Sequence, residues 1–230
     1  MEKLIIVGTS STARHVYSFI QYHRLFEVIG FAVNKAYIKD DVSFCGLPVL
    51  SLEQLVEDAS TKDYSLFIAM LWNHLNADRK KVYEYCSSKG FKLANIISPF
   101  AIVRGKLIGD NCWIHDYAVI QNDTIIGANV AIMQGSLVGA NCKIEPHCFL
   151  GAHSIVAGGC TVGEQSFIGL HATVFDDTQI GRKCIIGACS AVKRNVPDFS
   201  RCSISSESMV LKQYSEDEIE NKLVFSKNVR

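Results

Sequence analysis

The chain has 230 residues, of which 48% are hydrophobic and 20% are charged, and its 23 basic residues balance its 23 acidic ones. This composition is ordinary for a globular protein, and the absence of a basic surplus argues against nucleic acid and anionic membranes as partners. No apolar run is long enough to cross a bilayer, and the start of the chain lacks the pattern of a signal peptide. The nine cysteines show no C-x-x-C spacing. They therefore predict neither a metal site nor a disulfide framework, and they favour a reducing, cytoplasmic location.

Residues 1–98 alternate short apolar runs with helical patterns, which is typical of a small parallel α/β sheet of the Rossmann-like kind. Helices are predicted after Ser11, where Val16, Phe19 and Ile20 recur at helical spacing, and over 52–59 and 76–89. Strands are predicted over 3–8, 27–33, 65–71 and 92–97. The hydroxyl residues that precede the first helix are expected to cap it.

A glycine turn follows the first predicted strand. The turn at Gly8 aims backbone N–H groups at an anion such as a phosphate, although no second or third glycine completes a dinucleotide fingerprint. Asn34, just past the second strand, lies where an acidic ribose partner would be expected. At this point a ligand-free packing domain is as good an interpretation as a nucleotide site.

From Ala101 to Val196 the sequence divides into sixteen six-residue units without an insertion. The second residue is Ile, Val or Leu in every unit, the third is Gly in eight, and the sixth is mostly small. A fixed short period with one aliphatic residue per unit is typical of a solenoid. The pattern predicts a left-handed parallel β-helix over 99–196, with three units per coil and the aliphatic residues inside. Glycine and Asn/Asp positions are expected at corners that need unusual backbone angles.

Cysteines and the end of the chain fit the same repeat. Five cysteines occupy the sixth position, which requires a small residue, and they are predicted to be structural: Cys112, Cys142, Cys148, Cys160 and Cys184. The pattern stops after Val196, and residues 197–230 are predicted as a C-terminal tail with a polar helix over 215–223.

Four histidines lie in the repeat, His115, His147, His153 and His171. His153 and His171 are eighteen residues apart and should stack on one corner, where a histidine can act as a general base. The alternative is that these positions face solvent and merely tolerate histidine. Asp176 and its neighbour are expected to form an exposed polar corner. No G-x-S-x-G motif is present, so direct acyl transfer is favoured over a covalent intermediate.

Three stretches carry a resemblance to a known family: KLIIVGTSS, NHLNADRKKVYEYCSSKGFKLANIISPFA and LVGANCKIEPHCFLGAHSIVAGGCTVGEQSFIGLHATV. On these, the chain resembles bacterial hexapeptide-repeat sugar acetyltransferases of the sialic acid O-acetyltransferase and PglD-like group over nearly its whole length. The resemblance implies transfer of acetyl from acetyl-CoA to an amino group, or a hydroxyl, of a nucleotide-linked sugar in surface-polysaccharide or glycan biosynthesis. It also implies a homotrimer with active sites between neighbouring β-helices.

The resemblance assigns residues to these roles. It implies that the nucleotide sugar is held by Gly8, Thr9, Ser10 and Asn34, and that CoA lies along a groove at Gly151, Gly169, His171 and Gly187.

One residue departs from the family pattern. The position of the expected catalytic histidine is Ala140, followed by Asn141 where a residue that orients the imidazole is expected. Three explanations compete: an engineered replacement of histidine, a different base with His147 and His153 nearest in sequence, or lost activity in a scaffold or regulatory paralogue. The otherwise intact motif favours the first, and the expected loss of rate is then on the order of 10²–10⁴-fold.

Overall fold

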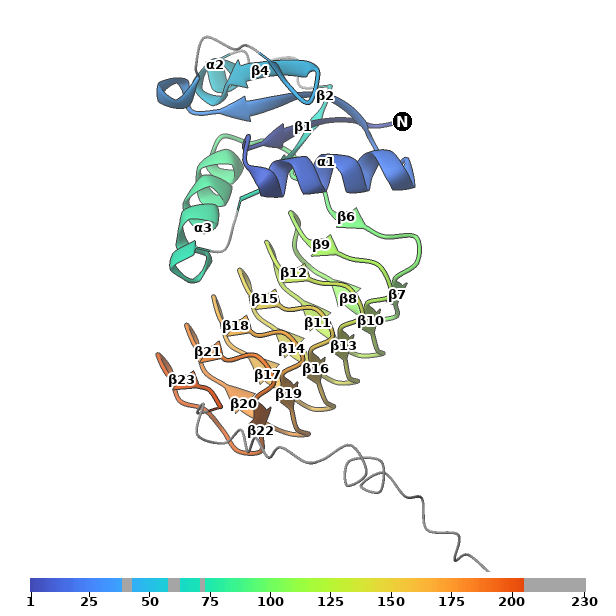
Figure 1. Cartoon of the computed structure of the whole chain (residues 1–230), viewed down its shortest axis with the longest axis vertical. Helices are drawn as coiled ribbons and strands as arrows, with labels where there is room; N and C mark the ends of the chain where they lie inside the picture. The colour runs from blue at the N-terminus through green and yellow to red at the C-terminus, as the bar shows by residue number, and fades with distance from the viewer. Residues whose placement is uncertain (39–42, 58–62, 71–72, 205–230) are drawn as a thin grey trace, which may run out of the picture.

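The computed structural model describes residues 1–38, 43–57, 63–70 and 73–204, in two parts stacked along the long axis of the molecule (Figure 1). The first part is an α/β domain and the second is a left-handed parallel β-helix, as the sequence predicts. Among these residues, no helix is both long and apolar enough to span a membrane. The helix predicted over 215–223 lies outside the described residues.

The α/β domain is built on a five-stranded sheet in the order β3-β4-β2-β1-β5, parallel except for the β3–β4 pair. Its strands are β1 (Lys3–Val7), β2 (Glu27–Val33), β3 (Ser43–Phe44), β4 (Leu47–Ser51) and β5 (Ser65–Ile68). Its helices are α1 (Ser11–His23), the short 3₁₀ helix η1 (Lys35–Tyr37), α2 (Leu52–Glu57) and α3 (Asn73–Ser88). The alternation of strands and helices is confirmed.

Two local expectations in this domain are corrected, and one strand, β4, was not predicted. β4 is not anticipated because Pro48 lies within it, and a proline normally argues against a strand. The strand predicted over 92–97 is reduced to β6 (Ile96–Ile97), with Leu93 forming only an isolated bridge to Leu66. Ser10 is the N-cap residue of α1, but its side chain makes no capping hydrogen bond.

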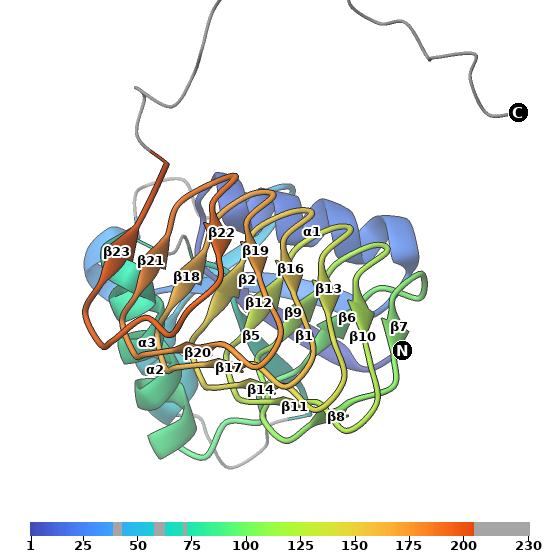
Figure 2. The same cartoon turned by 90° about the horizontal axis from the view of Figure 1, so that it is seen from below.

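The β-helix consists of three parallel sheets, which Figure 2 shows as the three sides of a stack of coils. The β6 sheet contains β6, β9 (Trp113–Ile114), β12 (Ala131–Ile132), β15 (Phe149–Leu150), β18 (Phe167–Ile168), β21 (Ile185–Ile186) and β23 (Arg201–Cys202). The β7 sheet contains β7 (Ile102–Val103), β10 (Val119–Ile120), β13 (Leu137–Val138), β16 (Ile155–Val156), β19 (Thr173–Val174) and β22 (Ala191–Val192). The β8 sheet contains β8 (Lys106–Leu107), β11 (Ile125–Ile126), β14 (Lys143–Ile144), β17 (Thr161–Val162) and β20 (Gln179–Ile180).

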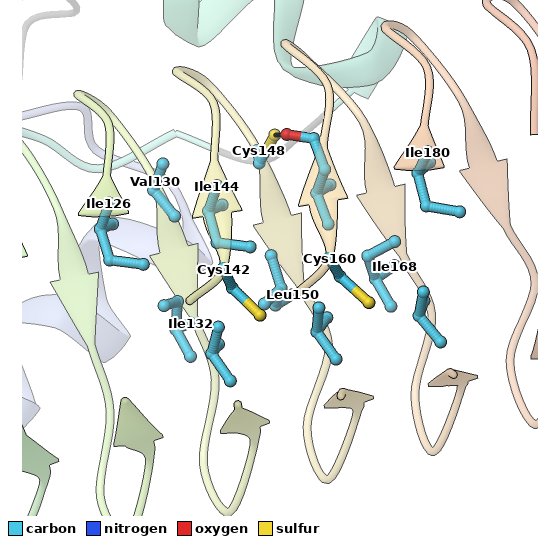
Figure 3. Close-up of a cluster of buried hydrophobic side chains, with 14 of the residues drawn as sticks. Ile126, Val130, Ile132, Cys142, Ile144, Cys148, Leu150, Cys160, Ile168 and Ile180 are labelled. Carbon is cyan, nitrogen blue, oxygen red and sulfur yellow. Dashed lines mark hydrogen bonds between the residues drawn. The ribbon is translucent and has the colours of Figure 1, made fainter. Parts of the chain in front are cut away.

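The second residue of each strand points into the coil and the first points out, so the interior is a column of aliphatic side chains (Figure 3). From Ile114 onward every second-position residue of the repeat is buried, as predicted. The first two units are the exception, since Ile102 and Ile108 are exposed. Val103 and Leu107 pack against the core instead. These two inward residues are four positions apart where the repeat predicts six, so the first coil turns this corner in a tighter loop.

The corners of the coils use two kinds of special residue. From Asn111 to Cys189, the fifth position of each unit takes a left-handed backbone conformation, for example at Asn141 and His153, both with positive φ. The glycines at the third position do not have positive φ. They are required because a Cβ there would collide with the next coil, at 2.7 Å from the backbone nitrogen of Gly158 in the case of Gly139. The expectation that these glycines supply unusual angles is therefore wrong; they permit close stacking.

The predicted structural cysteines are confirmed. All five sixth-position thiols are buried and donate to main-chain carbonyls of a neighbouring turn, as Cys142 does to Ala157 at 2.9 Å. Burial raises the pKa of Cys148 to about 12, so this thiol is unreactive in the folded protein.

Candidate active site

A pocket of about 380 Å³ opens at the carboxyl ends of β1, β2 and β5. This is the edge of an α/β sheet where ligands usually bind, and the volume is typical of small-molecule sites. All four residues that the resemblance assigns to the nucleotide sugar line it: Gly8, Thr9, Ser10 and Asn34. The sheet thus brings together residues that are up to 26 positions apart in the sequence.

The Asn34 side of this pocket is held by Glu53. The carboxylate of Glu53 accepts hydrogen bonds from the Asn34 side-chain amide at 3.3 Å and from the Lys35 backbone N–H at 2.8 Å. Because the amide NH₂ of Asn34 is engaged, its carbonyl oxygen is the group available to accept from a ligand. Although desolvation opposes it, this set of hydrogen bonds holds the pKa of Glu53 below its ordinary value.

Several lining residues were not foreseen from the sequence. Tyr37 is 74% exposed at the edge of the pocket, and Asn73 and Asp78 line it from α3. The signal that could have found Asn73 and Asp78 is their position just after the third parallel strand, because the carboxyl ends of parallel strands meet at one edge.

The β-helix has three corners, and the candidate residues of the repeat are spread over all of them. We name each corner by one residue: the His147 corner joins the β8 and β6 sheets, the His153 corner joins the β6 and β7 sheets, and the Ala140 corner joins the β7 and β8 sheets. Within one copy of the chain, Ala140, His147 and His153 are therefore not brought together.

The His147 corner is covered by α3 of the α/β domain. His147 is only 6% exposed, and its ring nitrogen Nδ1 lies 2.9 Å from the Asn129 amide, which in turn bonds Asn111 one coil further. From α3, Asn76 donates to the carbonyl of His147 and the Tyr83 ring contacts the imidazole. Burial lowers the pKa of His147 to about 4. These contacts make His147 a residue of the interface between the α/β domain and the β-helix, and it is not a candidate base.

Arg79 completes this covered corner. It is buried, and its guanidinium donates to the main-chain carbonyls of Ile68, Asn129 and Asn111. One side chain therefore joins a strand end of the α/β domain to two coils of the β-helix. Burial lowers the pKa of Arg79 to about 10, which leaves it charged at neutral pH.

The His153 corner is open to solvent. The rings of His153 and His171 are exposed and stack with centroids 5.1 Å apart and planes 12° apart, which confirms the predicted stacking. The residues that the resemblance assigns to CoA lie on this corner as well, one coil apart from one another: Gly151, Gly169 and Gly187, with His171 beside them.

The Ala140 corner is also exposed and is acidic. Ala140 and Asn141 lie there above Gly158, whose backbone N–H donates to the Asp176 carboxylate at 3.0 Å. From residue 121 to residue 178, the turns on this corner contain no basic side chain and three aspartates, Asp123, Asp176 and Asp177. Alanine cannot accept a proton, so position 140 itself supplies no base.

The β7 sheet connects the His153 corner to the Ala140 corner, and its outer face is uncharged. The outward residues of its six strands are Ile102, Val119, Leu137, Ile155, Thr173 and Ala191. Ile102 and Ile155 are 48% and 38% exposed. The outer face of the β8 sheet, by contrast, carries Lys106 and Lys143. The outer face of the β6 sheet is covered by α1, where Phe19 packs on Trp113.

Residues 105–140 match the family model described as bacterial transferase hexapeptide (six repeats), and residues 143–169 and 159–194 match the hexapeptide repeat of succinyl-transferase. Among curated proteins, no sequence matches the chain.

Solved structures match nearly the whole chain. A histidine-to-asparagine variant of perosamine N-acetyltransferase from Caulobacter crescentus, in complex with CoA and GDP-perosamine, is 27% identical with a TM-score of 0.77, over 88% of this chain and 93% of that chain. PerB of the same organism, with the same two ligands, gives 27% and 0.76 over 88% and 94%. The chain carries the hexapeptide repeat of bacterial transferases and is similar over most of its length to sugar N-acetyltransferases. The acetyltransferase domain of PglB from Neisseria gonorrhoeae, 21% identical, shares the fold with a TM-score of 0.76 over 89% and 97%.

Proposed function

We propose that this protein transfers an acetyl group from acetyl-CoA to an amino group of a nucleotide-linked sugar. The observation that carries the proposal is the pocket of the α/β domain at Gly8 and Asn34, in a chain of which 88% matches an N-acetyltransferase bound to CoA and GDP-perosamine. A glycine turn at the end of β1 suits a phosphate, and the Asn34 carbonyl oxygen suits a hydroxyl or N–H donor of the nucleoside.

The same proposal places CoA on the β-helix and makes the protein a homotrimer. The uncharged outer face of the β7 sheet supports contact between copies, because exposed apolar patches of this kind mark interaction surfaces. CoA would then run along the His153 corner at Gly151, Gly169 and Gly187. We place the reaction in the cytoplasm, where the nine free cysteines stay reduced. The balanced net charge supports no nucleic-acid partner and no membrane insertion.

The reaction needs a base and two bound substrates. The sugar nitrogen attacks the thioester carbonyl carbon, the C–S bond breaks, and the proton lost by nitrogen ends on the CoA thiol. Holding both substrates in line supplies much of the rate, since well-oriented groups gain on the order of 7–11 kcal/mol over free encounter. The sixth-position cysteines are buried and their thiols bond carbonyls, which supports direct transfer without a covalent enzyme intermediate.

The test is acetyl transfer by the purified protein. Acetyl-CoA is incubated with a panel of GDP-, UDP- and dTDP-linked amino sugars, and product is detected as the mass of one added acetyl group together with free CoA thiol. Transfer to at least one sugar nucleotide is expected. If the protein binds these ligands but acetylates none of the panel, the alternative of a scaffold or regulatory paralogue, which Ala140 already suggests, replaces the proposal.

A matched pair of tyrosine variants tests the pocket. Tyr37 and Tyr22 are similarly exposed, at 74% and 79%, but only Tyr37 lines the pocket. Loss of a base-stacking ring costs about 1–3 kcal/mol, so Tyr37→Ala should raise KM for the sugar nucleotide about tenfold or more and leave KM for acetyl-CoA unchanged. Tyr22→Ala should alter neither constant, and equal effects of the two substitutions would argue against nucleotide binding here.

A further inference from the structure

The Ala140 corner holds the position where the catalytic histidine is expected, but it has no evident base. Asn141 carries an amide, which does not take up a proton near neutral pH. The Asp176 carboxylate is already bonded to the backbone N–H of Gly158. Asp177 turns its carboxylate toward Gly159, because a Cβ built on Gly159 would lie only 2.2 Å from Asp177 Oδ1. Asp123 is exposed one coil before Asn141. Near neutral pH an imidazole is a better general base than a carboxylate, so a histidine from elsewhere is the stronger candidate.

The opposite edge of the same sheet carries the exposed histidines. The β7 sheet has the acidic Ala140 corner along one edge and the His153–His171 stack along the other. When three identical copies are arranged around an axis that faces this sheet, the two edges cannot meet within one copy. Each His153 corner instead meets the Ala140 corner of the next copy, which is a ring-closing, head-to-tail contact. The two edges are complementary, since one carries carboxylates and the other carries imidazoles that can take up a proton.

The heights of the side chains along the stack agree with this pairing. A Cβ built on Gly135 would lie 2.5 Å from Nδ1 of His153, so the His153 ring occupies the space beside the preceding coil. That coil is the one that continues through Leu137 to Ala140 and Asn141. By the same geometry the His171 ring, 5.1 Å further along, lies at the coil that reaches Gly159, where the Asp177 carboxylate is found. Glycine at 135 is what allows His153 to reach this height.

We propose that His153 of one copy is the catalytic base for the site at Ala140 of the neighbouring copy, in place of the histidine that position 140 lacks. The inference rests on the proposed acetyl transfer and on assembly through the β7 sheet. It selects the second of the three explanations for Ala140, a different base.

The chemistry requires one proton relay. As the sugar nitrogen bonds to the acetyl carbon, the His153 imidazole takes the proton that the nitrogen loses. The tetrahedral intermediate then expels the CoA sulfur, and the imidazolium returns the proton to that sulfur. The enzyme ends unchanged, with an N-acetyl sugar and free CoA as products.

Two stacked histidines provide a graded test within the corner. Removing a general base lowers the rate by on the order of 10²–10⁴-fold, so His153→Gln should lower kcat by that amount with KM for the sugar nucleotide nearly unchanged. His171→Gln lies one coil further from Ala140 and should lower kcat much less. Equal losses, or full activity of His153→Gln in an active wild-type background, would overturn the proposal while leaving the acetyltransferase function intact.

Mixing two inactive variants tests whether the base comes from a neighbour. The first is His153→Gln. The second is Ala140→Trp, whose indole fills the acceptor side of the site. In mixed trimers, a site formed by His153 of the tryptophan variant and Ala140 of the glutamine variant is complete, and such sites are about a quarter of the total at equal mixing. Recovery of about a quarter of wild-type activity is expected.

The controls separate the possible failures. Each variant alone must keep the wild-type oligomer mass and melting temperature, and a smaller substitution, Ala140→Leu, replaces Ala140→Trp if the tryptophan variant fails to fold. No recovery on mixing, with both variants folded and exchanged between trimers, would place the base in the same copy and overturn the proposal. A wild-type protein that acetylates no sugar nucleotide would instead refute the proposed function and, with it, this inference.

Discussion

The His147 and His153 corners carry the same residue at the same position of the repeat, yet the two histidines have opposite properties. Both have a left-handed backbone, with φ of 64° and 56°. His147 is buried beneath α3 and its pKa is lowered to about 4, whereas His153 is exposed and stacks on His171. The repeat determines the backbone of a corner, but the element that covers the corner determines its chemistry.

The same contrast explains why catalysis is assigned to the open corners. On the His147 corner, the His147 ring bonds the Asn129 amide and its main-chain carbonyl accepts from Asn76, while Arg79 donates to the main-chain carbonyl of Asn129. No substrate could reach the His147 ring without separating the two parts of the protein. Within one copy, no helix of the described residues covers His153 or Asn141, which are both exposed, and their corners border the β7 sheet, whose outer face is uncharged.

Moving the histidine from the His153 corner to position 140 should produce the largest effect on kcat. In a His153→Gln background, Ala140→His is expected to restore kcat by on the order of 10²-fold, because it returns a base to the same site. In the otherwise wild-type protein the same substitution should change kcat by less than a few-fold. Steady-state acetylation assays of the four proteins provide the measurement. A large gain in the wild-type background would instead support a native histidine at position 140 and contradict the role of His153.

Removing the hydrogen bonds that Arg79 donates at the His147 corner should have the next largest effect, on the free energy of unfolding. Arg79→Met leaves three main-chain carbonyls without their donor, and each buried acceptor left unsatisfied costs about 1–3 kcal/mol of unfolding free energy. Lys81→Met, at an exposed position on the same helix, should cost less than about 0.5 kcal/mol. Urea unfolding followed by circular dichroism measures both. Similar values for the two variants would show that the interface is not held by Arg79.

Acid should destabilise the His147 corner before the His153 corner. Burial lowers the pKa of His147 to about 4, below the ordinary value of about 6.5, so the unfolded chain binds more protons than the folded one between these values. The stability that His147 contributes is complete above pH 6.5 and is lost as the pH falls toward 4. Thermal melting across this range should be less steep in pH for His147→Asn. No change in steepness would contradict a buried neutral His147.

Thiol alkylation should give the smallest effect and needs no variant. Cys189 is exposed on the His153 corner, one coil past His171, while Cys112 and Cys148 are buried with pKa values raised to about 11 and about 12. Mild iodoacetamide treatment followed by peptide mass spectrometry should label Cys189 and leave the other two untouched until urea is added. CoA should slow labelling of Cys189, since the proposed groove passes this corner. Labelling that ignores CoA would argue against the groove.

Most of the fold could be predicted because the repeat is local. One aliphatic residue every six positions predicts the coil without knowledge of any distant contact, and Ile114 to Val192 obey it. The first coil departs from the pattern because its inward residues Val103 and Leu107 are four positions apart and not six. The apolar strands β1, β2 and β5 were predictable for the same local reason. β4 was not, because it contains Pro48 and a proline argues against a strand.

The site was only partly predictable. Gly8 and Asn34 could be found because each follows a parallel strand, and such strand ends converge. The burial of His147 could not be found, since it depends on Asn76 of α3, which is 71 residues away in the sequence. The height of the His153 ring depends on the absence of a side chain at Gly135, a contact between coils that the sequence pattern alone does not single out.

The most direct test of the central claim is a crystal structure with CoA and a nucleotide-linked amino sugar bound. The claim predicts a trimer in contact through the β7 sheets, with the CoA sulfur between the Ala140 corner of one copy and the His153 ring of the next. The sugar nitrogen should lie within hydrogen-bond reach, about 3 Å, of that ring. CoA bound to a single copy away from both corners, or copies that associate through the β8 sheet, would contradict it.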